Sequence, residues 1–215
     1  ETVLQAGDFA AAEKMFGDVA KLAGFASVDH ALYRQAFCLS KLDKFAEAAA
    51  LYARIPTEFA QSPYVADAAM SAGRCYYRTE QFPEAAQWFQ RTVDGQSSSR
   101  VEAAHWLCRI YLRDKKAQQA IELAKQVLPK AGDDPFAVNL QMDQADAWYE
   151  SADSRPEAVA AYLKIATGHP QHELAAQALY NAAFGALELG QYDEALKHTA
   201  DFLKAYPGHR LAPDV

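Results

Sequence analysis

Cysteine is scarce in this chain of 215 residues, which contains only Cys38, Cys75 and Cys108. Three widely spaced thiols do not form a disulfide framework, and the chain has no Cys-x-x-Cys motif that would offer a zinc or redox site. We therefore expect three buried free thiols. No apolar run approaches the roughly 18 residues that a membrane-spanning helix needs, so the sequence predicts no such helix.

Sequence motifs of catalysis are also missing, because the chain has no Gly-x-Ser-x-Gly, His-Glu-x-x-His, P-loop or Gly-x-Gly-x-x-Gly pattern. His169 and His172 lie close together without a third ligand nearby, so we predict no metal site. These absences predict that the protein is not an enzyme and needs no cofactor. A formal net charge of −7 argues against general binding to nucleic acid.

The chain does contain a long repeat, marked by an alanine that recurs every 35 to 38 residues. The marks are Ala12, Ala48, Ala85, Ala120, Ala158 and Ala195. Around them, apolar residues recur at i, i+3, i+4 and i+7, the period of an amphipathic helix. Each repeat predicts two helices, joined by a connection so short that the two must be antiparallel neighbours.

The first helices of the pairs, called A helices, are expected at 27–42, 63–79, 98–114, 136–152 and 172–189. The second, or B, helices are expected at 8–23, 44–59, 81–94, 116–131, 155–168 and 191–206. Ser154 and Glu157 have the spacing of a capping box at the start of one B helix.

These marks carry a family resemblance. Gly73-x2-Tyr76 followed by Ala85-x3-Phe89 resembles the tetratricopeptide repeat, and partial copies continue along essentially the whole chain. The resemblance implies an all-α fold, a right-handed superhelical solenoid of antiparallel helix pairs with about six repeats. We expect residues 1–215 to form a single solenoid domain and to be a fragment of a longer protein. The long repeats resemble those of bacterial envelope assembly proteins and the Tol-Pal coordinator.

The family's groove-lining positions fall on the A helices and imply a binding surface for a partner protein or peptide. Carried over to this sequence, the groove residues are Tyr33, Phe37, Lys41, Met70, Arg74, Tyr77, Arg78, His105, Arg109 and Arg113. Two arginine pairs from adjacent repeats would then form a four-arginine cluster. Guanidinium groups are suited to carboxylates, so we expect an acidic partner.

Other interpretations stay open at this stage. An alternative is that the arginines form a solvated or structural face, since cations near the end of a helix favour its dipole. Arg74 and Arg109 could pair with Asp67, Glu102 or Glu80. A second hypothesis is an assembly platform in a bacterial envelope complex that uses convex or edge surfaces. A distant third is a carbohydrate-active enzyme using Asp143, Asp146 and Glu150. The sequence leaves the compartment open between the cell envelope and the cytoplasm of a bacterium, and leaves the oligomeric state unknown.

Overall fold

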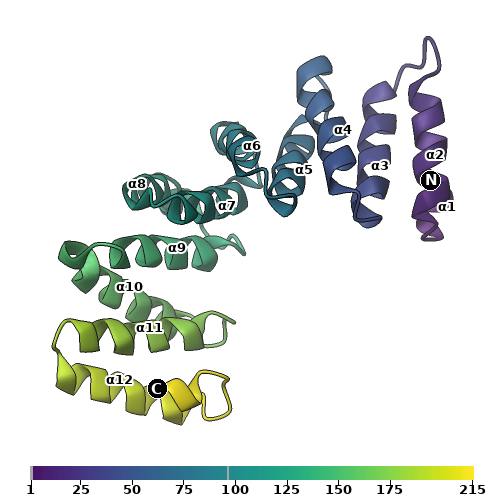
Figure 1. Cartoon of the computed structure of the whole chain (residues 1–215). Helices are drawn as coiled ribbons and strands as arrows, with labels where there is room; N and C mark the ends of the chain where they lie inside the picture. The colour runs from purple at the N-terminus through teal and green to yellow at the C-terminus, as the bar shows by residue number, and fades with distance from the viewer. Residues whose placement is uncertain (1, 96) are drawn as a thin grey trace. The chain divides into compact units, whose positions relative to one another are not determined.

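The computed structural model describes residues 2–95 and 97–215, and within these ranges every regular element is a helix. Figure 1 shows the helices following one another along the chain. Their bounds are α1 (Thr2–Gln5), α2 (Phe9–Ala20), α3 (Val28–Lys41), α4 (Phe45–Glu58), α5 (Val65–Arg78), α6 (Phe82–Asp94), α7 (Arg100–Arg113), α8 (Ala117–Val127), α9 (Ala137–Tyr149), α10 (Arg155–Gly168), α11 (Ala175–Glu188) and α12 (Tyr192–Ala205). Three short 3₁₀ helices are η1 (Leu128–Lys130), η2 (Ala152–Ser154) and η3 (Ala212–Asp214).

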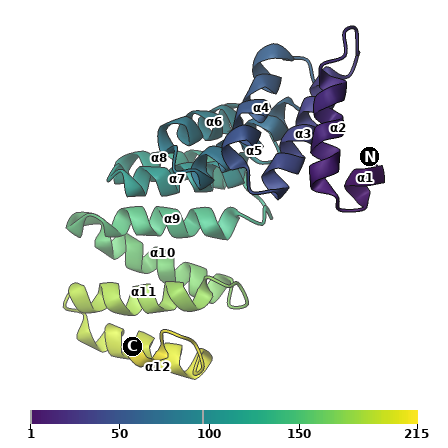
Figure 2. The ribbon, with the colours of Figure 1, turned by 45° about the vertical axis from the view of Figure 1, so that its right-hand side comes forward.

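The chain divides into two compact units, unit 1 (Glu1–Ala103) and unit 2 (Ala104–Val215). In unit 1, the helices from α2 to α6 each pack against the next one along the chain. In unit 2, the helices from α8 to α12 do the same, as both views show (Figures 1 and 2). The predicted all-α solenoid of helix pairs is confirmed. That residues 1–215 form a single domain stays a prediction.

A left-handed residue closes the turn between the A and B helices in several repeats. Asp43, Glu80 and Lys115 all have φ of 58°. After each one, the next backbone N–H bonds back to a carbonyl five residues earlier, as from Gln81 to Tyr76 at 2.9 Å. This bond satisfies a carbonyl that the end of the A helix leaves without a partner. The same turn at the same place in each repeat sets the antiparallel course of the pair.

Small residues at the repeat marks let the two helices of a pair approach closely. All six marked alanines are buried. In unit 1, a Cβ added to Gly73 of α5 would lie 2.6 Å from Cε1 of the Phe89 ring in α6. Such a distance is far below a normal contact, so only glycine fits beside this ring. The residues that mark the repeat in the sequence are therefore those at which the two helices of a pair pack closely.

Local details differ from the sequence prediction at two helix ends. Ser154 does not cap α10, because its hydroxyl donates to the backbone carbonyl of Trp148 at 2.7 Å. The predicted helix 116–131 is α8 only as far as Val127 and continues as the 3₁₀ turn η1, whose second residue is Pro129. The capping-box prediction was wrong because the end of α9, six residues earlier, offers the hydroxyl another acceptor. The prediction of buried free thiols is confirmed for all three cysteines.

Candidate peptide-binding groove

Unit 1 contains a hollow of about 500 Å³ between α3, α4 and α5. Five of the residues predicted for the groove line it, namely Tyr33, Phe37, Lys41, Arg74 and Arg78. The first three lie four residues apart on α3, and the two arginines lie four apart on α5, so each set occupies one helix face. The remaining lining residues are Ser40, Asp43, Phe45, Tyr52, Ser71 and Cys75.

Two cations at this hollow lie over aromatic rings. The Lys41 ammonium is 5.3 Å from the centroid of the Phe37 ring, and the Arg78 guanidinium is 4.9 Å from that of Phe45. Within residues 2–95 and 97–215, neither cation forms an ion pair. The rings hold the side chains in place and leave their N–H donors available to an acceptor.

Arg74 is held differently, by an ion pair with Glu102 of α7. Its Nε donates to Glu102 Oε1 at 2.9 Å, and its Nη2 donates to Glu102 Oε2. The Glu102 side chain is only 11% exposed, whereas that of Arg74 is 47% exposed. The carboxylate therefore neutralises this arginine, while part of the guanidinium still faces the hollow.

Burial favours the neutral form of a thiol and of a phenol in the hollow. It raises the pKa of the Cys75 thiol to about 11, against the opposing effect of Arg78 and Arg74. It also raises the pKa of the Tyr33 hydroxyl, and Asp67 adds to this effect. The thiol is thus inert, and Tyr33 can present a neutral hydroxyl and an aromatic face to a ligand.

Met70 and Tyr77, also predicted for the groove, lie elsewhere. Met70 is buried at 2% exposure, so its side chain belongs to the core of unit 1. The Tyr77 ring packs edge-on against Phe82 at 5.3 Å and is tilted against Phe89 at 6.5 Å. Tyr77 therefore covers α6 instead of lining the hollow. The family's positions gave the correct helix for both residues but not the direction of these side chains.

In unit 2, the predicted groove residues contact carboxylates of their own unit. His105 Nδ1 lies 2.5 Å from Asp143 Oδ2. Arg109 Nη1 lies 4.0 Å from Asp143 Oδ1 and 3.7 Å from Asp146 Oδ2. Arg113 Nη2 lies 2.5 Å from Oδ1 of its neighbour Asp114. The two arginine pairs belong to different units, and the four-arginine cluster stays a prediction.

Asp143 is a buried acid and Asp146 a half-buried one, and each is held by a hydrogen bond. The Asp143 side chain is only 3% exposed, and the Tyr162 hydroxyl donates to Asp146 Oδ1 at 2.7 Å. Burial raises the pKa of both carboxyls, although His105 opposes the effect at Asp143 and Tyr162 opposes it at Asp146. This geometry does not support a substrate-binding carboxylate pair, because Asp143 is not accessible.

Two aromatic residues that line the hollow in unit 1 were among those that the sequence did not predict. Phe45 and Tyr52 come from the B helix α4, whereas the family's groove positions are on A helices. Tyr52 marks the repeat four residues after Ala48, and its ring meets the Tyr33 ring at 5.5 Å. The spacing of apolar residues along α4 could have suggested that this B helix also lines the hollow.

No group of three or more His, Cys, Asp or Glu residues in the described part of the chain could hold a metal ion. In the same residues, no helix combines the length and the apolar character needed to cross a membrane.

Family models for the tetratricopeptide repeat match residues 60–100, and residues 30–62 and 177–209. These stretches cover three of the helix pairs described above. The chain thus contains tetratricopeptide repeats. A comparison with curated proteins finds no match. The likeness to bacterial envelope proteins and the Tol-Pal coordinator stays a prediction.

Solved structures of tetratricopeptide-repeat proteins share the fold. YrrB, described as a TPR protein with an unusual peptide-binding site, has a TM-score of 0.67 at 18% identity, covering 86% of this chain and 89% of its own. BtubC from P. vanneervenii has a TM-score of 0.70 at 13% identity, covering 94% and 92%. A tetratricopeptide repeat protein from Parabacteroides merdae has a TM-score of 0.70 at 11% identity, covering 95% of this chain and 76% of its own. Tetratricopeptide-repeat proteins are typically non-catalytic scaffolds for protein interactions.

Proposed function

We propose that this protein is a non-enzymatic scaffold that binds an extended segment of a partner protein in the unit 1 hollow. An acidic side chain of that segment lies between Lys41 and Arg78. The observation that carries this proposal is the convergence of these two cations, from different helices, on one hollow with aromatic walls.

The charge of the hollow favours an acidic ligand. Lys41 and Arg78 contribute two positive charges, Asp43 contributes one negative charge, and Arg74 is balanced by Glu102. The lining is therefore cationic in a protein with a net charge of −7. A local cationic site on an acidic protein attracts acidic segments, which the rest of the acidic surface repels.

The walls of the hollow suit an apolar residue beside the acidic one. Tyr33, Phe37 and Phe45 contribute aromatic side chains to the lining, and such residues often carry much of the energy of a protein interface. Ser40 and Ser71 add hydroxyls that can bond to a peptide backbone. YrrB, of similar fold, is itself described as having a peptide-binding site, which supports the same use here.

Binding to a peptide array tests this proposal. The array carries peptides with one phenylalanine flanked by glutamates, and matched peptides with lysines in place of the glutamates. We expect the protein to retain the acidic set and to release it as salt rises, because salt screens exposed charges. Equal retention of the acidic and basic sets, or retention that salt does not change, would sink the proposal.

A further inference from the structure

Unit 2 contains a hollow of about 550 Å³ among η1, α9 and α10, which we call the α9 hollow. Gln144 and Trp148 of α9 line it. They lie on the face of α9 opposite to Asp146, because a helix turns by about 100° per residue. Asp146 is the residue that approaches Arg109 of the predicted groove. The α9 hollow therefore lies on the side of α9 that faces away from the groove positions.

In unit 1, side chains fill the corresponding place between two B helices. Trp88 and Arg91 stand three and six residues after the marked Ala85 of α6. The Arg91 guanidinium is 5.5 Å from the centroid of the Trp88 ring, and its Nη2 donates to the backbone carbonyl of Pro56 in α4 at 3.0 Å. A ring and a hydrogen bond to a carbonyl thus bridge α4 and α6.

This bridge is missing at the matching positions of unit 2. Three and six residues after the marked Ala158 of α10 stand Ala161 and Lys164, and both line the α9 hollow. Leu128 of η1 takes the place of Pro56, eight residues after the marked alanine, and also lines it. The replacement of a tryptophan by an alanine leaves room for a ring that this chain does not supply from α10.

A buried amide without a partner faces this room. Gln144 is only 9% exposed, and within residues 2–95 and 97–215 its side chain forms no hydrogen bond. Its amide is not fully enclosed, so its donors and acceptor are open to the α9 hollow. Burial of a polar group without a hydrogen bond costs free energy. A ligand that bonds to Gln144 removes this cost.

We propose that the α9 hollow binds a proline-containing segment of a partner protein in the polyproline II conformation. A proline ring packs against the half-buried Trp148 in the room beside Ala161, and a backbone carbonyl accepts a hydrogen bond from the Gln144 amide. This site is separate from the hollow of unit 1, and neither proposal depends on the other.

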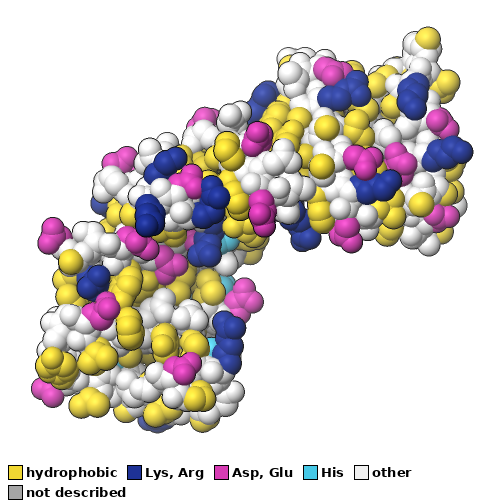
Figure 3. Space-filling model, viewed as in Figure 1, with side chains coloured by type: hydrophobic (Ala, Val, Ile, Leu, Met, Phe, Trp, Pro, Cys, Tyr) yellow, Lys and Arg dark blue, Asp and Glu magenta, His cyan; other side chains and the backbone are white. Residues whose placement is uncertain are grey.

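The charge of the lining favours a neutral occupant. Glu157 and Lys164 contribute opposite charges, so the lining has no net charge, unlike the cationic hollow of unit 1. On the face of unit 2 drawn in Figure 3, acidic and basic side chains are likewise interspersed among hydrophobic ones. A charged segment therefore gains little here from electrostatic attraction.

The hydrogen-bonding groups of the lining favour a polyproline II backbone. The Gln144 amide and the Trp148 indole offer N–H donors. A polyproline II segment has no internal hydrogen bonds, so its carbonyls are free to accept them. Its proline rings pack on aromatic side chains, and its preformed shape lowers the entropy lost on binding.

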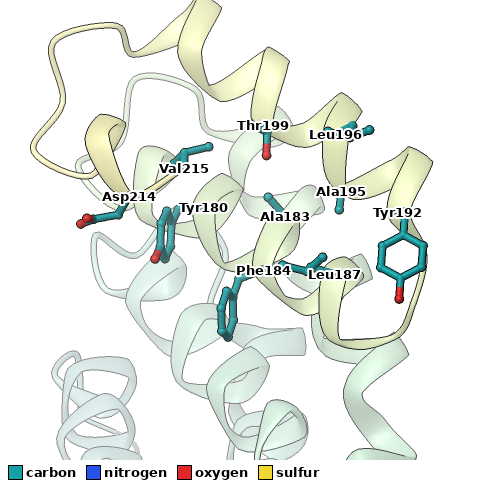
Figure 4. A pocket seen from close by; sticks show the side chains of 10 residues that line it. All are labelled: Tyr180, Ala183, Phe184, Leu187, Tyr192, Ala195, Leu196, Thr199, Asp214 and Val215. Atoms are coloured by element: carbon teal, nitrogen blue, oxygen red, sulfur yellow. The ribbon is translucent and has the colours of Figure 1, made fainter.

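Another hollow of unit 2 serves as an internal comparison. It has a volume of about 330 Å³, lies between α11 and α12, and is shown in Figure 4. Tyr180, Phe184 and Leu187 give it apolar walls, and its described lining residues include neither a tryptophan nor a side-chain amide. A ligand selected by Trp148 and Gln144 should leave this second hollow unchanged.

Titration of the whole chain with hexaproline, blocked at both ends and followed by NMR, tests the site. We expect saturable shifts of the Gln144 amide and Trp148 indole resonances, and none of the Ala183 methyl in the second hollow. Gln144→Leu removes the donor and should weaken hexaproline binding by about fivefold or more. Gln119→Leu, at an exposed glutamine of α8, is the matched control and should leave the affinity unchanged.

Ala161→Trp places on α10 the ring that Trp88 supplies on α6, and it should abolish hexaproline binding. This variant keeps the test decisive if Gln144→Leu does not fold. Ala152→Trp, at an exposed alanine of η2, is its control. Absence of saturable shifts in the wild-type protein, or affinity that survives in a folded variant of either kind, would overturn the proposal.

Two neutral competitors test the nature of the occupant. We expect neither a blocked (Gly-Ser)₃ peptide nor maltohexaose to displace hexaproline at equal concentration. Displacement by the flexible peptide would overturn the polyproline II conformation, and displacement by the sugar would assign the site to a carbohydrate. Self-association in the ultracentrifuge that Ala161→Trp abolishes would overturn the proposal in favour of a second copy of this chain.

Discussion

Arg74 in α5 forms a two-point ion pair with Glu102 in α7, and the carboxylate is much more deeply buried than the guanidinium. This pair gives Arg74 a structural role, because the loss of one partner would leave the other charge uncompensated. Lys41 and Arg78 are therefore the cations that set the charge of the unit 1 hollow. The pair also allows the ligand affinity to be changed without altering the hollow itself.

Glu102→Gln should strengthen the binding of an acidic peptide to unit 1. The substitution keeps the shape of the side chain and removes the charge that neutralises Arg74, so a third cation becomes available to the ligand. We expect an affinity about three- to tenfold higher, since a tenfold change corresponds to about 1.4 kcal/mol. Fluorescence anisotropy with a glutamate-containing peptide measures it. An unchanged or weaker affinity would show that Arg74 does not face the bound segment.

Gly73→Ala should destabilise unit 1, because the new Cβ would lie 2.6 Å from the Phe89 ring. Overpacking of this kind costs about 1–3 kcal/mol in the free energy of unfolding. Urea denaturation measures the loss. Gly168→Ala is the control, since a Cβ there meets nothing within 4 Å and should cost little. Equal effects of the two substitutions would contradict the close approach of α5 and α6.

His105→Ala should destabilise unit 2, because it leaves the buried Asp143 carboxylate without its 2.5 Å partner. We expect a loss of about 2–4 kcal/mol in the free energy of unfolding at neutral pH. The exposed His169→Ala is the control. The loss should shrink when Asp143→Asn accompanies His105→Ala, since the amide carries no charge. A double variant as unstable as the sum of the single ones would argue against the pair.

Asp146→Asn should reduce the dependence of stability on pH. The pKa of Asp146 is raised in the folded protein above its ordinary value of 3.8, so the folded state holds its proton more tightly. The stabilisation of the folded state by this carboxyl is fully present below the ordinary pKa of 3.8 and is lost as pH rises through the raised pKa. The wild-type protein should lose stability in this window, and Asp146→Asn should lose less. Asp153→Asn, at an exposed position, should follow the wild type.

The sequence predicted the helix pairs well because the repeat encodes packing. Ala85, Phe89 and Gly73 recur at fixed spacing since the same A and B helices meet in the same way each time. The observed helices begin and end within a few residues of the predicted ones. The resemblance also placed Lys41 and Arg78 on the faces that line a hollow.

The sequence determined the partners of the charged residues less well, because it offered Glu102 as one of several acids for Arg74 and no partner for His105. Arg74 and Glu102 are 28 residues apart, and His105 and Asp143 are 38 apart, so both pairs depend on tertiary geometry. No local spacing rule relates such residues.

The affinity of the Lys41→Ala/Arg78→Ala double variant for an acidic peptide tests most directly whether unit 1 is a binding groove. Its control, Lys14→Ala/Arg54→Ala, removes the same charge from unit 1 at positions outside the hollow. We expect the groove variant to bind about tenfold or more weakly than the wild type, and the control to bind within about twofold of it. Equal weakening in both variants, or none in the groove variant, would contradict the proposed function.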